Sequence, residues 1–236
     1  DGDGDLEIAI AGFFGKVYAW HHDGTMMSGF PVETIGREPE EFDEYKNFDQ
    51  GFLAAITLYD LDGDGTLELI GSSMDSRLYV FAHDGSNWGP YPIEICTPDF
   101  CGEVNSRSIT SPAVGDMDND GEAEILIGNS MTIGSFSYSF MYDALSGTLE
   151  DGWPHGSVSF GSTLSLPMVG EGHPAPSAVA DIDGDGDMEI ADPIAFGVTN
   201  PFHHDSTEAL SISYVAEDFG SGSSTNVSNL LPFNSY

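Results

Sequence analysis

Four short acidic strings contain the residues whose types and spacing could do chemistry. The string at residues 60–69 has aspartates at its first, third and fifth positions, glycine at its sixth and glutamate at its ninth. Alternate residues of a tight turn point their carboxylates at one centre, and glycine permits the bend. Hard oxygen donors in such a set suit Ca²⁺, whereas Mg²⁺ requires a stricter octahedron and Zn²⁺ prefers nitrogen and sulfur. The spacing therefore predicts a calcium-binding loop whose seventh residue offers its backbone carbonyl.

Repetition argues against a merely solvated acidic turn. Related strings occupy residues 1–8, 116–125 and 181–190, at intervals of roughly 60 residues. Two carboxylates about 4.5 Å apart repel by roughly 4 kcal/mol at an effective dielectric constant of 20. Without a cation, four such carboxylates would destabilise the turn that holds them.

The EF-hand is the nearest alternative, because it also begins with alternating aspartates followed by glycine. An EF-hand needs a bidentate glutamate at position 12 and flanking helices. Position 12 of the later strings is Gly71, Ile127 or Asp192, and strand-like segments flank the loops. The spacing therefore excludes an EF-hand.

Composition excludes several classes of function. The 236 residues include 40 Asp+Glu and only 5 Lys+Arg, which gives a formal net charge of −35. Nucleic acids and anionic membranes are bound through clustered basic residues, so neither is an expected partner. No apolar stretch approaches the roughly 20 residues of a membrane-spanning helix. An apolar content of 40% with 11% aromatic residues indicates a packed fold.

The sequence around each string also repeats. A short apolar run follows the string, then an aromatic segment with alternating pattern, an Asp-Gly turn and an aromatic-proline pair. Such alternation and frequent turn glycines favour four antiparallel strands per repeat, and no window shows helical periodicity. Repeats of this kind predict an all-β fold, a β-propeller or propeller fragment of four-stranded blades. The aromatics expected between blades are Tyr18, Trp20, Tyr79, Phe81, Tyr138 and Phe140, with sugar stacking as the alternative.

The repeats divide one propeller-like domain, residues 1–236, into approximate units 1–50, 51–106, 107–172 and 173–236. Residues 33–50 form an acidic insertion, and residues 220–236 a tail rich in Ser, Gly and Asn. Cys96 and Cys101 favour a local disulfide of an exported protein, with two free thiols as the alternative. Asn226 begins an N-glycosylation acceptor sequence.

Taken together, these strings and the Ser-Pro-Ala-Val and Gly-Phe-Pro-Val segments around them resemble FG-GAP/VCBS repeats, the class that includes the integrin alpha-subunit propeller. The resemblance covers nearly the whole chain and implies a propeller with calcium loops between the first two strands of each blade. It also implies up to four Ca²⁺ ions. The side-chain ligands that it implies are Asp1, Asp3 and Glu7; Asp60, Asp62, Asp64 and Glu68; Asp116, Asp118, Asp120 and Glu124; and Asp181, Asp183, Asp185 and Glu189. The residues at the seventh position, whose spacing predicts a backbone carbonyl ligand, are Asp5, Thr66, Glu122 and Asp187.

Catalysis is not expected. His21, His22 and His83 precede Asp-Gly turns and are interpreted as turn or surface residues, and no nucleophile elbow, Cys/His pair or zinc-protease string occurs. We therefore expect a secreted or cell-surface scaffold for adhesion, with a protein ligand, a glycan or copies of itself as partner. The alternatives are a protomer of an extracellular fibre or surface layer and a polysaccharide-active propeller enzyme.

Overall fold

The computed structural model describes residues 2–36, 51–95, 106–131, 136–158, 171–172, 176–182, 184, 186, 188–192, 201–205, 215–217 and 224–226. Every regular element in these residues is a β-strand, and all strand pairs are antiparallel. The expected all-β class is therefore confirmed.

Four sheets follow the four repeats, each with its strands in chain order. The first sheet contains β1 (Ile8–Ala11), β2 (Lys16–Trp20) and β3 (Val32–Glu33). The second contains β4 (Thr57–Tyr59), β5 (Glu68–Ser72), β6 (Arg77–Phe81) and β7 (Ile93–Glu94). The third contains β9 (Ala113–Gly115), β10 (Glu124–Gly128), β12 (Phe136–Asp143) and β13 (His155–Val158). The fourth contains β15 (Ala178–Ala180), β16 (Glu189–Ala191) and β17 (Pro201–His203).

Four strands per repeat are thus found in the second and third sheets, and three in the described parts of the first and fourth. The described part of the first sheet begins at its acidic loop. Two further sheets in the described residues were not expected from the sequence. A small sheet joins β8 (Ser106–Arg107), β11 (Ser130–Met131) and β14 (Glu171–Gly172), and β18 (Val215–Glu217) pairs with β19 (Ser224–Asn226).

The start of the acidic insertion was predicted one residue too early. Glu33 lies in β3, where it pairs with Lys16 across the sheet, and the two side chains form an ion pair of 2.6 Å. Residues 37–50 of the insertion, Cys96 and Cys101 lie outside the described residues, as does all of the tail except 224–226.

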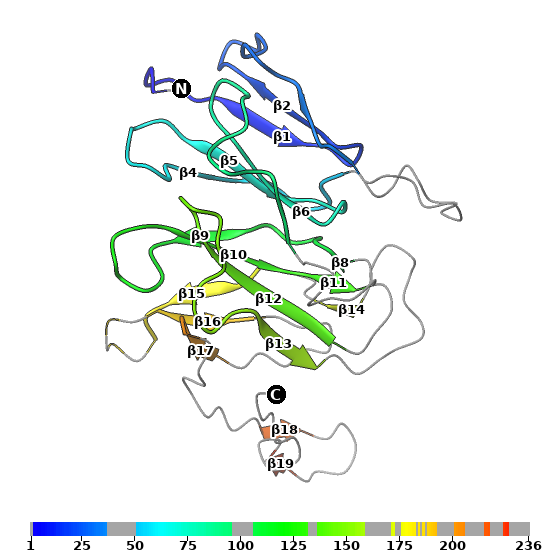
Figure 1. Cartoon of the computed structure of the whole chain (residues 1–236), viewed down its shortest axis with the longest axis vertical. Helices are drawn as coiled ribbons and strands as arrows, with labels where there is room; N and C mark the ends of the chain where they lie inside the picture. The colour runs from blue at the N-terminus through cyan, green and yellow to red at the C-terminus, as the bar shows by residue number, and fades with distance from the viewer. Residues whose placement is uncertain are drawn as a thin grey trace, which may run out of the picture.

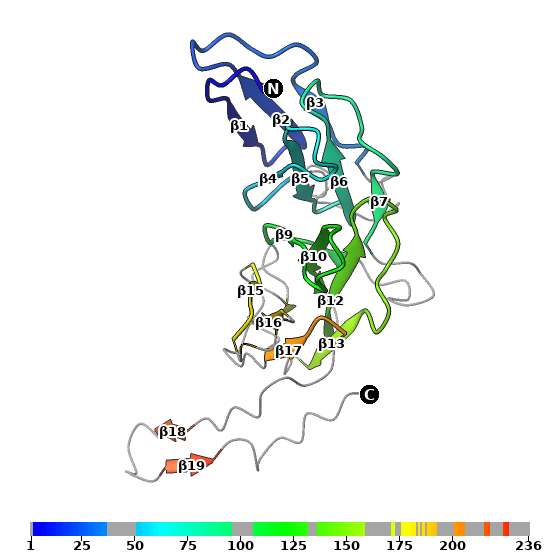
Figure 2. The ribbon, with the colours of Figure 1, turned by 90° about the vertical axis from the view of Figure 1, so that its left-hand side faces the viewer.

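The first three sheets follow one another along the long axis of the molecule, and the fourth lies beside the third (Figures 1 and 2). Consecutive sheets pack face to face. All five residues of β5 and all five of β10 are buried, because each of these strands is central in a sheet covered on both sides. Side chains alternate between the two faces of a strand. Leu69 accordingly packs in a cluster with the first sheet, whereas the next residue, Ile70, packs in a cluster with the third. The described residues do not close the stack into a ring.

Hydroxyl groups connect consecutive sheets. The Tyr142 hydroxyl donates to the carbonyl of Ile95 at 2.6 Å, and the Tyr91 hydroxyl donates to the carbonyl of Ala144 at 3.0 Å. These bonds link the second and third sheets in both directions. Because each polar end is satisfied, the rings can be buried without leaving an unpaired group in the core.

In the third repeat, the aromatic pair that corresponds to Tyr18 and Trp20 lies two residues later than the predicted pair, Tyr138 and Phe140. Strand register matches Ile8 with Trp20, Leu69 with Phe81 and Ile125 with Tyr142. Phe140 and Tyr142 therefore correspond to Tyr18 and Trp20 in the first sheet and to Tyr79 and Phe81 in the second. The reason is that β12 runs to Asp143 and a longer turn follows it. Since the shift is an even number of residues, Tyr138 still points to the face that packs against the second sheet.

Candidate metal centres

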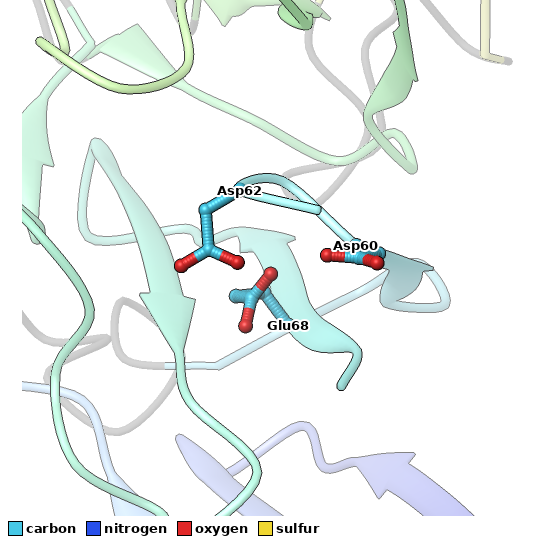
Figure 3. A group of neighbouring side chains, drawn as sticks. All are labelled: Asp60, Asp62 and Glu68. Atoms are coloured by element: carbon cyan, nitrogen blue, oxygen red, sulfur yellow. The ribbon is translucent and has the colours of Figure 1, made fainter. Parts of the chain in front are cut away.

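The acidic loop of the second sheet joins β4 to β5 and gathers three carboxylates at one end of β5. Asp60 directly follows β4, Asp62 lies two residues further on, and Glu68 is the first residue of β5. One oxygen from each lies within 4.8 Å of the others (Figure 3). This distance suits oxygens that share one cation, because oxygens each 2.3–2.6 Å from Ca²⁺ lie at most about 5 Å apart.

Hydrogen bonds within the loop hold its aspartates in place. The Asp60 carboxylate accepts from the backbone N–H groups of Asp64 at 3.1 Å and Gly65 at 3.0 Å, and Asp62 also accepts from Asp64 at 3.1 Å. Gly63 and Gly65 have φ angles of 72° and 90°, which glycine adopts most readily. The spacing of aspartates and glycines thus fixes a turn that directs carboxylates inward.

The third sheet repeats the arrangement between β9 and β10. Oxygens of Asp116, Asp118 and Glu124 lie within 4.8 Å of one another, and the Gly121 N–H donates to Asp116 at 3.1 Å. Oδ1 of Asp116 is buried and has no hydrogen-bond partner among the described residues. A buried anionic oxygen without a partner is costly, and a bound cation would satisfy it.

The closing glutamates are the buried members of these sites. Glu68 and Glu124 are each 2% exposed. One oxygen of Glu68 accepts from the N–H of Leu61 at 2.8 Å, and one of Glu124 accepts from the N–H of Met117 at 2.6 Å. The other oxygen of each remains available to the centre of the loop.

Burial also changes how these glutamates titrate. Loss of hydration raises the pKa of Glu68, and it raises the pKa of Glu124 to about 7, although the N–H bond to each carboxylate acts in the opposite direction. The negative charges of nearby aspartates add to both increases. Carboxylates that repel one another in this way are ionised together most readily around a cation.

The aspartates at the fifth position lie outside the two triads. The Asp64 carboxylate accepts from both the N–H and the hydroxyl of Thr66, at 2.7 and 2.6 Å, and Asp120 accepts from the N–H of Glu122 at 2.8 Å. These bonds hold the end of the loop. The structure thus brings together three of the four predicted side-chain ligands in each loop.

The first and fourth loops differ from the other two. No further triad is found in the described residues, which exclude Asp1, Asp183, Asp185 and Asp187. Within the first loop, the Asp5 N–H donates to the Asp3 carboxylate at 2.8 Å. In the fourth loop, Asp181 accepts from the Gly184 N–H at 2.6 Å, and buried Glu189 accepts from the Ile182 N–H at 2.6 Å.

Histidines face the closing glutamates of these two loops. His203 lies opposite Glu189 across the sheet, with 3.1 Å between its Nδ1 and a carboxylate oxygen. In the first loop, Nδ1 of His21 is 4.0 Å from Glu7, and Nδ1 of His22 is 3.3 Å from Asp5. Proximity to the acidic loops was not predicted for these histidines. The available signal was their position at or just after the end of the strand that pairs with the strand following each acidic loop.

All four loops lie along one edge of the stacked sheets, on the left in Figure 1. The side-chain amide of Asn119 in the third loop donates to the carbonyl of Gly186 in the fourth. A single edge therefore collects the strongest negative charge of the described chain.

One further buried acid lies at a different place, between the first two sheets. Asp75 is 2% exposed and accepts from the Tyr79 hydroxyl at 2.5 Å and from the Gly36 N–H at 3.2 Å. Its carboxylate is also 3.6 Å from the guanidinium of Arg77, and burial raises the pKa of this carboxyl. The network ties residues after β3 to β6. It was not predicted, because nothing local in the sequence marks Asp75 as buried.

Comparison with known proteins supports the repeat assignment. Residues 60–127 match the model of the FG-GAP-like repeat family. The solved structure of the exotype rhamnogalacturonan lyase YesX resembles the chain with a TM-score of 0.51 and 19% identity, over 88% of this chain and 38% of the lyase. The chain thus spans well under half the length of that protein. A comparison with curated protein sequences finds no match.

The likeness to this lyase concerns the fold alone, given the identity of 19%. The described residues include no helix long and apolar enough to cross a membrane. Residues 60–127 contain both acidic triads, and this segment matches the FG-GAP-like repeat family, as the sequence resemblance predicted.

Proposed function

We propose that the chain is a calcium-stabilised β-propeller scaffold that acts outside the cell in adhesion or ligand binding, without catalysis of its own. The observation that carries the proposal is the pair of matching acidic triads in the second and third loops. Both consist only of oxygen donors, and each has a buried glutamate at its base. Calcium prefers oxygen ligands and tolerates irregular geometry, so it is the cation that this set fits best.

In this proposal the ions have a structural role. Each ion joins the end of one strand to the start of the next and neutralises carboxylates that otherwise repel. Because the site exists only in the folded chain, calcium binding adds directly to the free energy of unfolding.

The test is calcium titration of the chelator-treated chain by calorimetry, together with melting curves. We expect saturable binding at two or more sites and a marked rise in melting temperature with Ca²⁺. Mg²⁺ at the same concentration should produce a much smaller rise. The double variant Glu68→Gln, Glu124→Gln keeps the size of both side chains and should lose most of the binding. An unchanged melt with and without calcium would contradict the proposal.

A polysaccharide-active enzyme is the second candidate, and the likeness to a rhamnogalacturonan lyase is what favours it. Against it, an anionic uronate needs cationic side chains, and the chain has only five. Two of the five are already engaged, since Lys16 pairs with Glu33 and Arg77 with Asp75. Product release from a glycan panel, read as new reducing ends or unsaturated products, would favour this candidate over the scaffold.

A further inference from the structure

One hydrogen bond joins two neighbouring acidic loops directly. The side-chain amide of Asn119, in the third loop, donates to the backbone carbonyl of Gly186, in the fourth. Asn119 holds the fourth position of its string, and Gly186 holds the sixth position of the next string. The two residues lie 67 positions apart in the sequence, so the bond forms only when both loops are folded and adjacent.

The residue at the fourth position is glycine in the second and fourth strings. Gly63 and Gly184 have φ angles of 72° and 81° there, and Asn119 has a φ angle of 61°. This left-handed conformation favours glycine, and asparagine is among the few other residues that adopt it. The turn itself would accept glycine in the third loop as well. What Asn119 adds is therefore its amide group.

In the described residues, the second and third loops are not joined in this way. A Cβ placed on Gly63 has nothing within 4 Å, and neither has one placed on Gly121, the sixth residue of the third string. The apolar packing of the two pairs of loops is alike. In each pair, the second-position side chain of one loop shares a core cluster with the eighth-position side chain of the next: Leu61 with Ala123, and Met117 with Met188. The hydrogen bond is therefore what distinguishes the third and fourth loops.

The bond connects the two candidate metal sites themselves. Asn119 directly follows Asp118, a member of the third triad. A cation that holds the Asp118 carboxylate also restricts the backbone of the next residue, and with it the direction of the Asn119 amide. Gly186 lies between Asp185 and Asp187, the fifth and seventh positions of the fourth string. The accepting carbonyl thus belongs to the part of the fourth string that is predicted to bind its own ion.

The described part of the fourth loop is built like the third. The N–H of Ile182 donates to the Glu189 carboxylate at 2.6 Å, as the N–H of Met117 donates to Glu124 at 2.6 Å. Both glutamates are buried. The fourth loop thus has the closing glutamate of a calcium loop in the same position as the third.

We propose that Asn119 couples these two loops, so that calcium bound in the third raises the calcium affinity of the fourth. This inference rests on the proposed calcium-binding function. Each ion holds one partner of the hydrogen bond in place, so the second ion to bind meets a loop that is already ordered. The effect is reciprocal, because two coupled sites change each other's affinity by the same factor. Asn119 is a positioning residue in this coupling and is not one of the implied calcium ligands.

Charge acts against the coupling. A cation in one loop weakens the attraction of its neighbour for a second cation. Salt reduces this effect beyond about 8 Å at physiological ionic strength, whereas it leaves a direct hydrogen bond in place. The difference between the wild type and a variant without the Asn119 amide therefore isolates the bond, because both chains carry the same charge.

Trp153 provides the reporter for a calcium titration. It is buried in the same core cluster as Met117 and Ile190, between the third and fourth sheets. In the background Trp20→Phe, Trp88→Phe it is the only tryptophan of the chain, which has three. Its fluorescence in moderate salt should therefore follow calcium binding by these two loops.

Asp181→Asn changes a predicted ligand at an exposed position of the fourth loop and leaves the third site to be titrated. The chain with both sites should show a steep transition. Asp181→Asn should make it shallower and move its midpoint to a calcium concentration about threefold higher or more. Asn119→Gly introduces the residue found at this position in the second and fourth loops. In that variant the transition should be shallow already, and Asp181→Asn should no longer shift the titration of the third site.

Asp60→Asn is the matched control, because it changes the first position of the second string, which no such bond joins to the third loop. It should shift the Trp153 transition less than Asp181→Asn does, and by the same amount with or without the Asn119 amide. Circular dichroism in excess calcium should show that all variants fold.

A shift caused by Asp181→Asn that is equal with and without the Asn119 amide would overturn the coupling, although calcium binding itself would stand. So would a wild-type transition that is as shallow as that of Asn119→Gly. A chain that shows no calcium binding in calorimetry or fluorescence would instead overturn the proposed function, and the coupling with it.

Discussion

The first and second sheets are built from one sequence pattern and differ in what lies against them. Both pair an aliphatic residue with an aromatic one at the same register, Ile8 with Trp20 and Leu69 with Phe81. Ile8 is 53% exposed, whereas Leu69 is 5% exposed. The pattern therefore specifies a face that can be buried, and the neighbouring sheet decides whether it is buried.

The acidic loops of the second and third sheets, in contrast, agree with each other. Each loop runs between two paired strands, β4 and β5 or β9 and β10, and its carboxylates form a triad. The repeated spacing therefore gives the same arrangement in both sheets.

The largest effect should come from truncating matched core positions. Leu69→Ala removes a buried side chain between two sheets and should lower the free energy of unfolding by about 2–5 kcal/mol. Ile8→Ala, at the equivalent position of the first sheet, should lower it by less than about 1 kcal/mol, because the side chain is already half in water. Chemical denaturation of the monomeric, calcium-loaded chain measures both.

Ile70→Ala provides the control for position along the stack. Ile70 is fully buried toward the third sheet, so its loss should match that of Leu69. Equal losses at Ile8 and Leu69 would break the comparison and would mean that the face of the first sheet that carries Ile8 is covered in solution.

The second-largest effect concerns calcium affinity and distinguishes two aspartates of one loop. Asp60→Asn removes the charge of a triad member and should lower calcium affinity by about tenfold or more. Asp64→Asn alters a carboxylate that is bonded to Thr66 and lies outside the triad, so it should change affinity less. Calcium titration by calorimetry distinguishes the two. Equal losses would show that calcium draws Asp64 into its coordination shell.

Much of this architecture could be predicted from the sequence, because the features concerned are local and repeated. The acidic spacing located both loops, and the alternation of Tyr79 and Phe81 located a buried face. The missing information concerned contacts over long sequence distances. No local signal distinguishes buried Asp75 from exposed aspartates, and the two-residue shift at Tyr138 depends on the length of β12.

The third effect is a pH dependence that reverses with calcium. The pKa of Glu124 is about 7 in the folded, metal-free chain, against an ordinary value of 4.5. Between these values the folded state binds the additional proton, so the free energy of unfolding falls as pH rises through this window. With calcium bound, protons compete with the ion, and stability should rise with pH instead.

Melting curves from pH 4.5 to 8, with chelator and with excess calcium, measure this reversal. Glu124→Gln should flatten both curves, leaving the smaller contribution of Glu68, whose pKa burial also raises. A metal-free chain that gains stability continuously with pH would contradict the assigned state of Glu124.

The smallest effect concerns the Asp-Gly turns, where matched substitutions should change the melting temperature equally in the first and second sheets. In the Asp-Gly turn of the first sheet, the Asp23 carboxylate accepts from the N–H and hydroxyl of Thr25, and in the second sheet Asp84 accepts likewise from Ser86. These bonds lower the pKa of both aspartates, so their stabilising effect is present above the pKa of the unfolded chain and is lost on acidification. Both aspartates are solvent-exposed, and the bonds that they accept come from their own turns. Asp23→Ala and Asp84→Ala should therefore lower the melting temperature slightly and by the same amount, in contrast to the unequal losses expected at Ile8 and Leu69. A larger loss at Asp84 would show that neighbouring repeats stabilise the turn as well as the core.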